Sequence, residues 1–412
     1  SLLVSWPRQI SSAGLAEREH EYIPKERPGV KSICGVEGVR AYGIKEGKFG
    51  LALIEAKGTA AGVFTTNLVR APPVTLMEEQ IRKGCLEAVI VNSGCANAYT
   101  GTRGYDDAVR MTEIAGSALG IDSGNVGVAS TGVIGRYLDL PLISSQCMKI
   151  APLLERSSHA ETLAARAIMT TDLTEKHALV SGDGFSVGGI TKGSGMIAPN
   201  MGTMLAFIYT DAELPAAELS SILKQAADRT FNRVVVDGDM STNDLALCTA
   251  TGAAGTVDRA TFARALEKCC RNLAIQIAMD GEGATKLLEV TVNGAPSEAA
   301  AASVARTVVA SPLVKTAIYG QDPNWGRVIA AAGRAGVGFD PYTVDLWISD
   351  GSRTLPLVRE GAIVVDLAAA KQLMHGKKVI FLLDLHAGSG VATAWGCDLT
   401  EKYVEINGRY TT

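Results

Sequence analysis

The chain has 412 residues, of which 47% are hydrophobic and 20% charged, and its net charge is −4 at pH 7. These values are typical of a soluble globular protein that is long enough for two domains and a large core. The weakly acidic balance offers no basic surface for a nucleic acid, and no apolar run reaches the roughly 18 residues of a membrane helix. We therefore expect no nucleic-acid or membrane partner, and a cytoplasmic location (the mitochondrial matrix in a eukaryote).

The eight cysteines form no C-x-x-C pair and no recognisable metal or disulfide framework. Most of them stand in apolar surroundings, where a buried free thiol is the default and a reducing compartment is expected. The sequence also contains no phosphate-binding loop and no dinucleotide fingerprint. We therefore expect neither a metal nor a cofactor.

Short apolar runs between polar or glycine turns predict strands in the first part of the chain, at 39–44, 49–55, 61–65 and 88–91, with a short helix at 78–83. Helical periodicity follows at 105–119 and 160–169, with a strand at 125–129. Further along, strands are expected at 204–209, 234–236 and 287–292, and helices at 215–229 and 261–278.

The last third continues the same alternation. Helices are predicted at 299–309 and 328–335, the second with Asn324 as a plausible N-cap, and strands at 344–348, 355–358, 379–383 and 403–412. The chain contains no long linker, charge run or low-complexity segment. The pattern predicts an α/β fold in which helices are layered on central β-sheets, in one body of two intimately packed lobes.

A glycine-rich run between 182 and 202 ends abruptly at Thr203, behind Gly202, and a fully apolar strand follows. A hydroxyl at the first position of a buried strand is the arrangement expected where a chain cuts itself and exposes an N-terminal nucleophile. The alternative is a glycine hairpin that leads into a core strand, with an ordinary Thr at its edge. Taken alone, the pattern favours the hairpin.

Two other hydroxyl-bearing turns are candidates for the same chemistry. Thr131 and Gly132 follow a strand and could present a hydroxyl and a backbone N–H to an oxyanion, or could simply cap the next element. Thr170 and Thr171 end a helix beside Asp172. This turn could hold a substrate amine or carboxylate, or could be only a polar turn.

Three further loops carry polar groups. Glu282 lies between two glycines that shield it little, so it could pair with a substrate ammonium. The loop that contains Asn92 and Asn97 could be a wall of the site or a structural Asx turn. The acidic loop at 237–244 lacks the closing Glu of a calcium loop, and we interpret it as a self-satisfied polar loop.

These segments together resemble the glutamate/ornithine N-acetyltransferase family. The resemblance extends over nearly the whole chain and rests on eight motifs in order: VNSGCANA (91–98), STGVIG (130–135), MTTD (169–172), KGSGMIAPNMGTML (192–205), DGDMSTND (237–244), DGEGATK (280–286), YGQDPNWGR (319–327) and ATAWGCDLT with YVEINGRYTT (392–412). Any one of these would be weak evidence, whereas eight in sequence make the match specific.

The resemblance implies a self-cleaving precursor, cut between Gly202 and Thr203 into an α chain (1–202) and a β chain (203–412). It makes Thr203 the nucleophile and gives Thr131 and Gly132 the role of oxyanion hole. The substrate-binding positions that it implies are Thr170 or Thr171, Lys192, Thr203, Glu282, Asn407 and Thr412. The family usually has Ala where this chain has Gly202, a residue with unusual backbone freedom.

The implied activity is transfer of an acetyl group from N2-acetyl-L-ornithine to L-glutamate by a ping-pong route, in the arginine pathway or in a specialised-metabolite pathway. Acetyl-CoA is a possible second donor, and an (αβ)₂ heterotetramer is the implied assembly. Two alternatives remain open. One is an N-terminal-nucleophile aminopeptidase or amidase, and the other is a non-catalytic binding protein in which Thr203 is only a strand residue.

Overall fold

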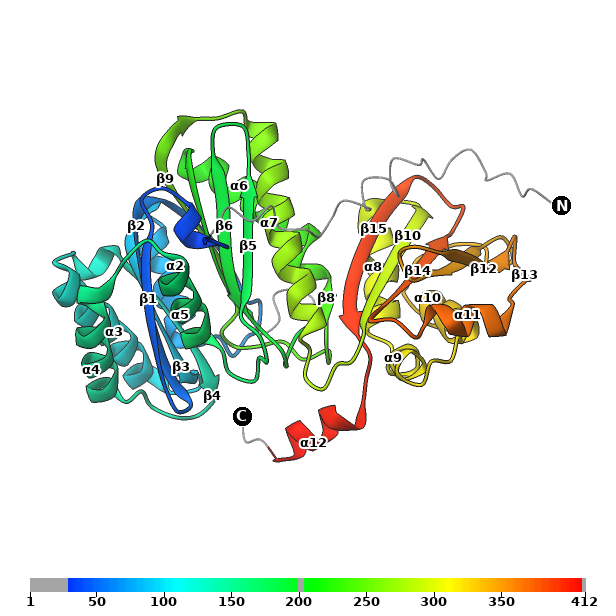
Figure 1. Ribbon diagram of the computed structural model, residues 1–412, viewed down its shortest axis with the longest axis horizontal. Coiled ribbons are helices and arrows are strands. Elements are labelled where there is room, and N and C mark those ends of the chain that lie inside the picture. Colours follow the sequence, from blue (N-terminus) through cyan, green and yellow to red (C-terminus); the bar gives the residue numbers. More distant parts are fainter. Residues whose placement is uncertain (1–28, 199–203, 410–412) are drawn as a thin grey trace.

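The computed structural model describes residues 29–198 and 204–409 (Figure 1). Gly202, Thr203 and Thr412, three of the predicted site residues, lie outside these ranges. The described chain is a mixed α/β protein built on two β-sheets with helices packed against them, which confirms the predicted fold class.

The first sheet contains eight of the described strands, in the order β4-β3-β2-β9-β7-β6-β5, with β1 paired to one end of the long strand β2. The pairs β3–β4 and β7–β9 are parallel, and the other neighbours are antiparallel. The strands are β1 (Arg40–Glu46), β2 (Phe49–Phe64), β3 (Cys85–Cys95), β4 (Val126–Val133), β5 (Lys176–Ser181), β6 (Ser186–Lys192), β7 (Leu205–Glu213) and β9 (Leu245–Thr256).

Helices cover both faces of this sheet. The pair α6 and α7 packs on one face of its central strands, α5 packs on the other face, and α3 and α4 cover the end that contains β3 and β4 (Figure 1). These helices are α2 (Pro72–Ile81), α3 (Gly101–Leu119), α4 (Leu140–Ile150), α5 (Ser158–Ile168), α6 (Ala216–Arg229) and α7 (Arg259–Met279). Short 3₁₀ turns lie at η1 (Ile33–Gly35), η2 (Ser123–Asn125), η3 (Ala151–Leu153) and η4 (Phe231–Arg233).

The sequence of strand β7 is apolar at nearly every position because both of its faces are buried. Ala206 and Ile208 pack into the core under α6 and α7, whereas Phe207 and Tyr209 point to the opposite face and join the core under α5. Successive residues of a strand alternate between faces, so a strand buried on both sides needs no polar positions.

The second sheet has the order β13-β12-β11-β14-β10-β15-β8 and is covered on one face by α8 and its neighbours. Its strands are β8 (Val234–Val235), β10 (Leu287–Ala295), β11 (Asp345–Ser349), β12 (Thr354–Arg359), β13 (Ala362–Ile363), β14 (Lys378–Asp384) and β15 (Gly390–Cys397). The helices that follow β10 are α8 (Glu298–Val309), α9 (Pro312–Tyr319), α10 (Trp325–Gly333) and α11 (Leu367–Leu373), and α12 (Glu401–Arg409) ends the described chain.

The two sheets share a hydrophobic core at the level of α7. Leu287, Trp395 and Cys397 of the second sheet belong to the same buried cluster as the inner face of α7. Helix α7 is therefore packed against both sheets, and the two lobes form one body, as predicted.

The structure corrects the prediction for the C-terminal segment. The strand expected at 403–412 is helical over the described residues, because they form α12. Glu405 pairs with Lys402 at 2.9 Å and with Arg409 at 3.1 Å, spacings of three and four residues that stabilise a helix rather than a strand. None of the α12 residues is buried, so no strand-like apolar face competes with these pairs.

Other differences concern boundaries. The strands expected at 49–55 and 61–65 are one continuous strand, β2, and the glycine-rich stretch contains β6, which the sequence did not predict. A Cβ on Gly188 would lie 2.5 Å from the backbone oxygen of Ser32, so this glycine allows close packing instead of making a turn. The helix expected at 78–83 is α2, which starts at Pro72, a proline tolerated at the first helical position.

None of the helices in the described part of the chain is both long and apolar enough to cross a membrane.

Acid should destabilise the fold through His177 on β5. Burial lowers the pKa of this imidazole from 6.5 to about 4, and only its Nδ1 meets a described partner, the Ser32 hydroxyl at 2.9 Å. Between pH 6.5 and 4 the unfolded chain binds a proton that native His177 does not, so the free energy of unfolding falls as the pH falls. The loss should amount to about 3 kcal/mol, measured by urea denaturation between pH 7.5 and pH 4.

In His177→Gln this part of the pH dependence should disappear, although other groups will still titrate. His375→Gln, a change at an exposed histidine, is the matched control and should keep the wild-type slope. An equal slope in His177→Gln and wild type would show that His177 is not the responsible group.

Candidate functional site

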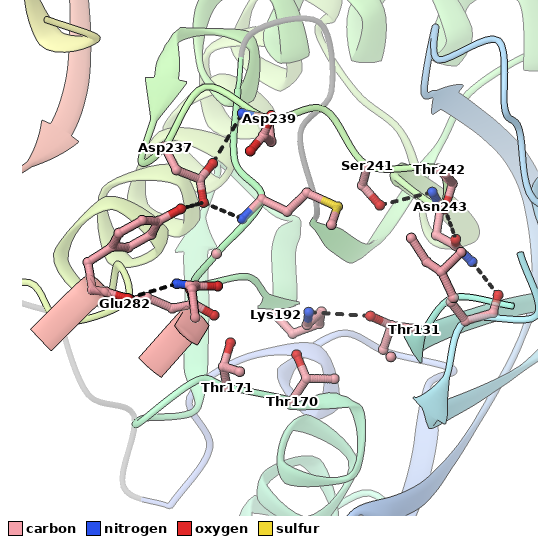
Figure 2. A pocket seen from close by; sticks show the side chains of 17 residues that line it. Thr131, Thr170, Thr171, Lys192, Asp237, Asp239, Ser241, Thr242, Asn243 and Glu282 are labelled. Carbon is pink, nitrogen blue, oxygen red and sulfur yellow. Dashed lines mark hydrogen bonds between the residues drawn. The ribbon is translucent and has the colours of Figure 1, made fainter. Parts of the chain in front are cut away.

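A cavity of about 200 Å³ lies where the ends of several elements meet (Figure 2). Its walls come from the end of β4, the turn after α5, the end of β6, the loop after β8, the turn after α7 and helix α12. The seven predicted site residues within the described ranges all line it: Thr131, Gly132, Thr170, Thr171, Lys192, Glu282 and Asn407.

Thr131 and Gly132 reach the cavity because β4 runs parallel to β3 and ends beside it. Gly132 has a φ of +133°, and a Cβ there would lie 2.4 Å from the carbonyl carbon of Gly94. Only glycine fits this close approach of two backbones. The tight crossing fixes the backbone next to the Thr131 hydroxyl, which is the rigidity that an oxyanion-binding site requires.

Lys192 is the last residue of β6, and its side chain is almost fully buried. Its Nζ donates to the Thr131 hydroxyl at 3.3 Å. Burial lowers the pKa of Lys192, and the negative charge of Asp172 opposes this shift. A buried ammonium that has one weak neutral partner among the described residues is well suited to receive a ligand carboxylate.

The turn that carries Thr170 and Thr171 follows α5. Asp172, which ends this turn, accepts the backbone N–H of Thr170 at 3.0 Å. Its carboxylate is fully buried, and Asp172 is not among the residues that line the cavity. The two threonines thus line the cavity as predicted, but Asp172 does not.

Glu282 and Asn407 meet at the other side of the cavity (Figure 2). The Asn407 amide donates to Glu282 Oε2 at 2.6 Å, so Glu282 has a protein partner, which the sequence did not indicate. Glu282 is also buried, although the glycines beside it suggested exposure. Asn407 reaches it only because the C-terminal segment is a helix.

The loop at 237–244 is both structural and part of the cavity wall. Asn243 donates through its side chain to the carbonyls of Ala96 and Ser130, at 2.7 and 2.9 Å, and so braces the loop against β3 and β4. Internal bonds such as Asp239 N–H to Asp237 agree with a self-satisfied loop. The loop nevertheless contributes Asp237, Asp239, Ser241, Thr242 and Asn243 to the cavity, which the sequence interpretation missed.

Asn92 and Asn97 serve local structure. The Asn92 amide donates to the carbonyl of Cys95, and that of Asn97 donates to the carbonyl of Gly104. Both residues are buried, and of the segment 91–98 only Ala96 lines the cavity. For these two asparagines the structural alternative is the one that the hydrogen bonds support.

Tyr403 and Asp237 form a further contact at the mouth, because the Tyr403 hydroxyl lies 3.3 Å from Asp237 Oδ2. Burial raises the pKa of Asp237, and burial with the nearby Asp237 charge raises that of Tyr403. The only signal for Tyr403 in the sequence was its place in the C-terminal motif.

The cavity has opposite charge at its two sides. The Lys192 ammonium lies beside Thr131, whereas Glu282 and Asp237 lie across the cavity from it (Figure 2). A small zwitterion with an added amine or carboxylate matches this arrangement in size and charge. The site is thus suited to amino-acid-like ligands.

Known proteins of similar sequence agree with a site for amino-acid-like ligands. The model of the ArgJ family matches residues 36–412. The chain is 51% identical over 388 residues to a glutamate N-acetyltransferase of Methanosarcina mazei, with 92% of this chain and 98% of that one covered. It is 48% identical over 380 residues to the arginine biosynthesis bifunctional protein ArgJ of Symbiobacterium thermophilum, covering 89% of this chain and 93% of the other.

Among solved structures, a chain of the arginine biosynthesis bifunctional protein ArgJ from Bacillus halodurans is 42% identical, with a TM-score of 0.46. The match covers 48% of this chain and 96% of that chain.

The family match and the names of these relatives define an enzyme of the acyltransferase class. The chain belongs to the ArgJ family. This confirms the resemblance found in the sequence.

Proposed function

We propose that the enzyme transfers an acetyl group from N2-acetyl-L-ornithine to L-glutamate, through an acetyl ester on Thr203. The observation that carries this proposal is the single cavity that joins Thr131 and Gly132, Lys192 and Glu282. The names of the relatives support it, since they are glutamate N-acetyltransferases and bifunctional proteins of arginine biosynthesis.

The nucleophile arises by scission of the chain. The Thr203 Oγ attacks the Gly202 carbonyl carbon, the peptide C–N bond breaks, and an ester joins the two residues. Breakage of the C–N bond frees the Thr203 α-amine, and water then hydrolyses the ester, which frees the Gly202 carboxylate and the Thr203 hydroxyl. An α-amine has a pKa of about 7.7–8, so it can act as a general base near neutral pH.

In the first half-reaction the α-amine accepts the proton of the Thr203 hydroxyl as Oγ attacks the acetyl carbonyl. The developing oxyanion accepts hydrogen bonds from the Thr131 hydroxyl and the Gly132 N–H. The C–N bond to ornithine then breaks, the proton passes to the leaving amine, and acetyl-Thr203 remains. The Lys192 ammonium binds the α-carboxylate, and Glu282 with Asn407 binds the side-chain ammonium.

In the second half-reaction the amine of glutamate attacks the acetyl ester, and N-acetylglutamate leaves with the acetyl group. The same cavity serves both amino acids in turn, which gives ping-pong kinetics. Acetyl-CoA serves as a second acetyl donor, and two cleaved αβ pairs form an (αβ)₂ assembly. Both points rest on the family resemblance.

Release of ornithine tests the proposal against its nearest rival. We expect glutamate to accelerate ornithine release from N-acetylornithine and to become acetylated in equal amount. Intact-mass spectrometry with N-acetylornithine alone should show an added acetyl group on the 203–412 chain. In an aminopeptidase or amidase, water takes the acyl group, so ornithine release that is independent of glutamate and yields free acetate would contradict the proposal.

A further inference from the structure

A buried group of three charges lies directly behind the cavity wall. Lys176, the first residue of β5, places its Nζ 2.7 Å from Asp172 Oδ1 and 2.6 Å from Asp280 Oδ2. The three side chains are 1%, 0% and 8% exposed. None of them lines the cavity, and the mechanism above does not use them.

The two carboxylates of this trio, Asp172 and Asp280, hold separate parts of the wall together. Asp172 accepts the backbone N–H of Thr170 at 3.0 Å and that of Gly193 at 2.7 Å. It therefore fixes the threonine turn relative to the end of β6, where Lys192 stands.

Asp280 holds together the part of the wall that carries Glu282. Its carboxylate accepts the backbone N–H of Leu173 at 3.0 Å, and its carbonyl accepts the Ser194 hydroxyl at 2.6 Å. The Glu282 N–H in turn donates to the Ser194 carbonyl at 3.0 Å. Through Lys176, the trio thus connects the segments that carry Thr170, Lys192 and Glu282.

The trio also carries one negative charge in excess, close to Lys192. Although burial favours its neutral form, Lys176 and Lys192 hold the pKa of Asp172 well below its usual range. Asp172, Asp244 and Glu282 favour the charged form of Lys192, in that order, while burial and Lys176 oppose it. Lys45 is a further positive charge near Lys192. Its pKa is lowered to about 8, first by burial and then by the positive charge of Lys192.

A buried ion group of this kind adds little stability compared with packed apolar side chains, because each charge loses its hydration. Its bonds instead specify one geometry for three wall segments, and the negative charge of Asp172 favours the charged form of one ligand-binding lysine. Both effects act on the shape and charge of the cavity rather than on the stability of the core.

We propose that Lys176, Asp172 and Asp280 are positioning residues, which hold the Thr170, Lys192 and Glu282 segments in register and keep Lys192 charged for a ligand carboxylate. This inference rests on the proposed function, because it takes the ligand to be an amino acid. Asp172 supplies the charge effect, and Asp280 supplies the alignment of Glu282.

Calorimetric titration of the full-length enzyme with ornithine between pH 6 and pH 9 tests this. In Asp172→Asn, loss of the negative charge should lower the pKa of Lys192, so that it loses its proton at lower pH. The affinity of the variant relative to wild type should therefore be lower at every pH, and it should fall by at least a further threefold or so, about half a pKa unit, between pH 6 and pH 9. The titration of ornithine itself cancels in the ratio of variant to wild type.

Asp280→Asn separates the two effects. It retains Asp172, so the affinity for ornithine should fall about fivefold or more at every pH, without a change in the pH dependence. The variant also serves if Asp172→Asn does not fold, because unchanged affinity in folded Asp280→Asn would overturn the alignment role and with it the proposal.

Asp345→Asn is the matched control. Asp345 is a buried carboxylate of the second sheet that accepts the Glu360 N–H at 2.6 Å and pairs with Arg359 at 3.4 Å. Its variant should lose thermal stability but keep the wild-type affinity profile. A folded Asp172→Asn enzyme with the same profile would mean that the trio is merely structural. Absence of ornithine binding to wild type would instead refute the proposed substrate, and this inference with it.

Discussion

Thr203→Ala should leave one uncut chain of about 43.1 kDa, where the wild type should give two chains, 1–202 and 203–412. The variant lacks the hydroxyl that we propose attacks the Gly202 carbonyl, so no ester should form and no α-amine should be released. Acetyl transfer should fall by at least about 10⁴-fold, as for the loss of other enzymatic nucleophiles. Intact-mass spectrometry and ornithine release measure the two results on the same sample.

Thr210→Ala is the matched control for this experiment. Thr210 is a buried hydroxyl on β7, and it donates to the Ser186 carbonyl at 2.8 Å. Its loss should cost about 1 kcal/mol of stability and leave scission intact. A wild-type chain that transfers acetyl groups without being cut would rule out the α-amine as the base.

Lys192→Met should raise the KM for N-acetylornithine about 100-fold and change kcat less than about fivefold. The variant retains the length of the side chain but removes the buried charge expected to bind the α-carboxylate, and a charge-assisted hydrogen bond contributes about 1.5–3 kcal/mol. Steady-state kinetics of ornithine release at saturating glutamate measure both constants.

Lys192 has a rival role, because its Nζ lies 3.3 Å from the Thr131 hydroxyl and could assist the reaction at Thr203 electrostatically. That role predicts the opposite result, a collapse of kcat with little change in KM. Lys268→Met, a change at an exposed lysine of α7, should leave both constants unaltered and controls for the loss of a positive charge.

Much of the fold could be predicted because its signals are local. Most of the predicted helices and strands are present in the structure. The predicted start of α7, at Thr261, lies only two residues after the observed start at Arg259. Asp258 caps this helix by accepting the Thr261 N–H at 2.8 Å. The errors arose where tertiary packing decides. Strand β6 contains adjacent glycines that are unfavourable in isolation but necessary beside Ser32 and Leu273.

The residues of the candidate site divide in the same way, into those with a local signal in the sequence and those that only tertiary packing brings together. The motifs indicated Thr131, Lys192 and Glu282, because hydroxyl and charged residues in glycine-rich turns stand out in a sequence. The trio behind the wall was not indicated, because Lys176 and Asp280 are 104 positions apart and the packing of α7 on β5 brings them together. Glu282 lines the cavity, but its amide partner on α12 depended on a helix that the sequence analysis had taken for a strand.

The strand order of the first sheet bears on what scission would leave behind. Strands β7 and β9 follow Thr203 in the chain, yet they occupy adjacent central places, with β6 on one side and β2 on the other. Both flanking strands come from the segment before the cut. The two products would therefore be interleaved, held by backbone hydrogen bonds along two full strand borders and by a common core. Cutting the bond would change the chemistry at one residue while the two products stay together, because neither of them contains the complete first sheet.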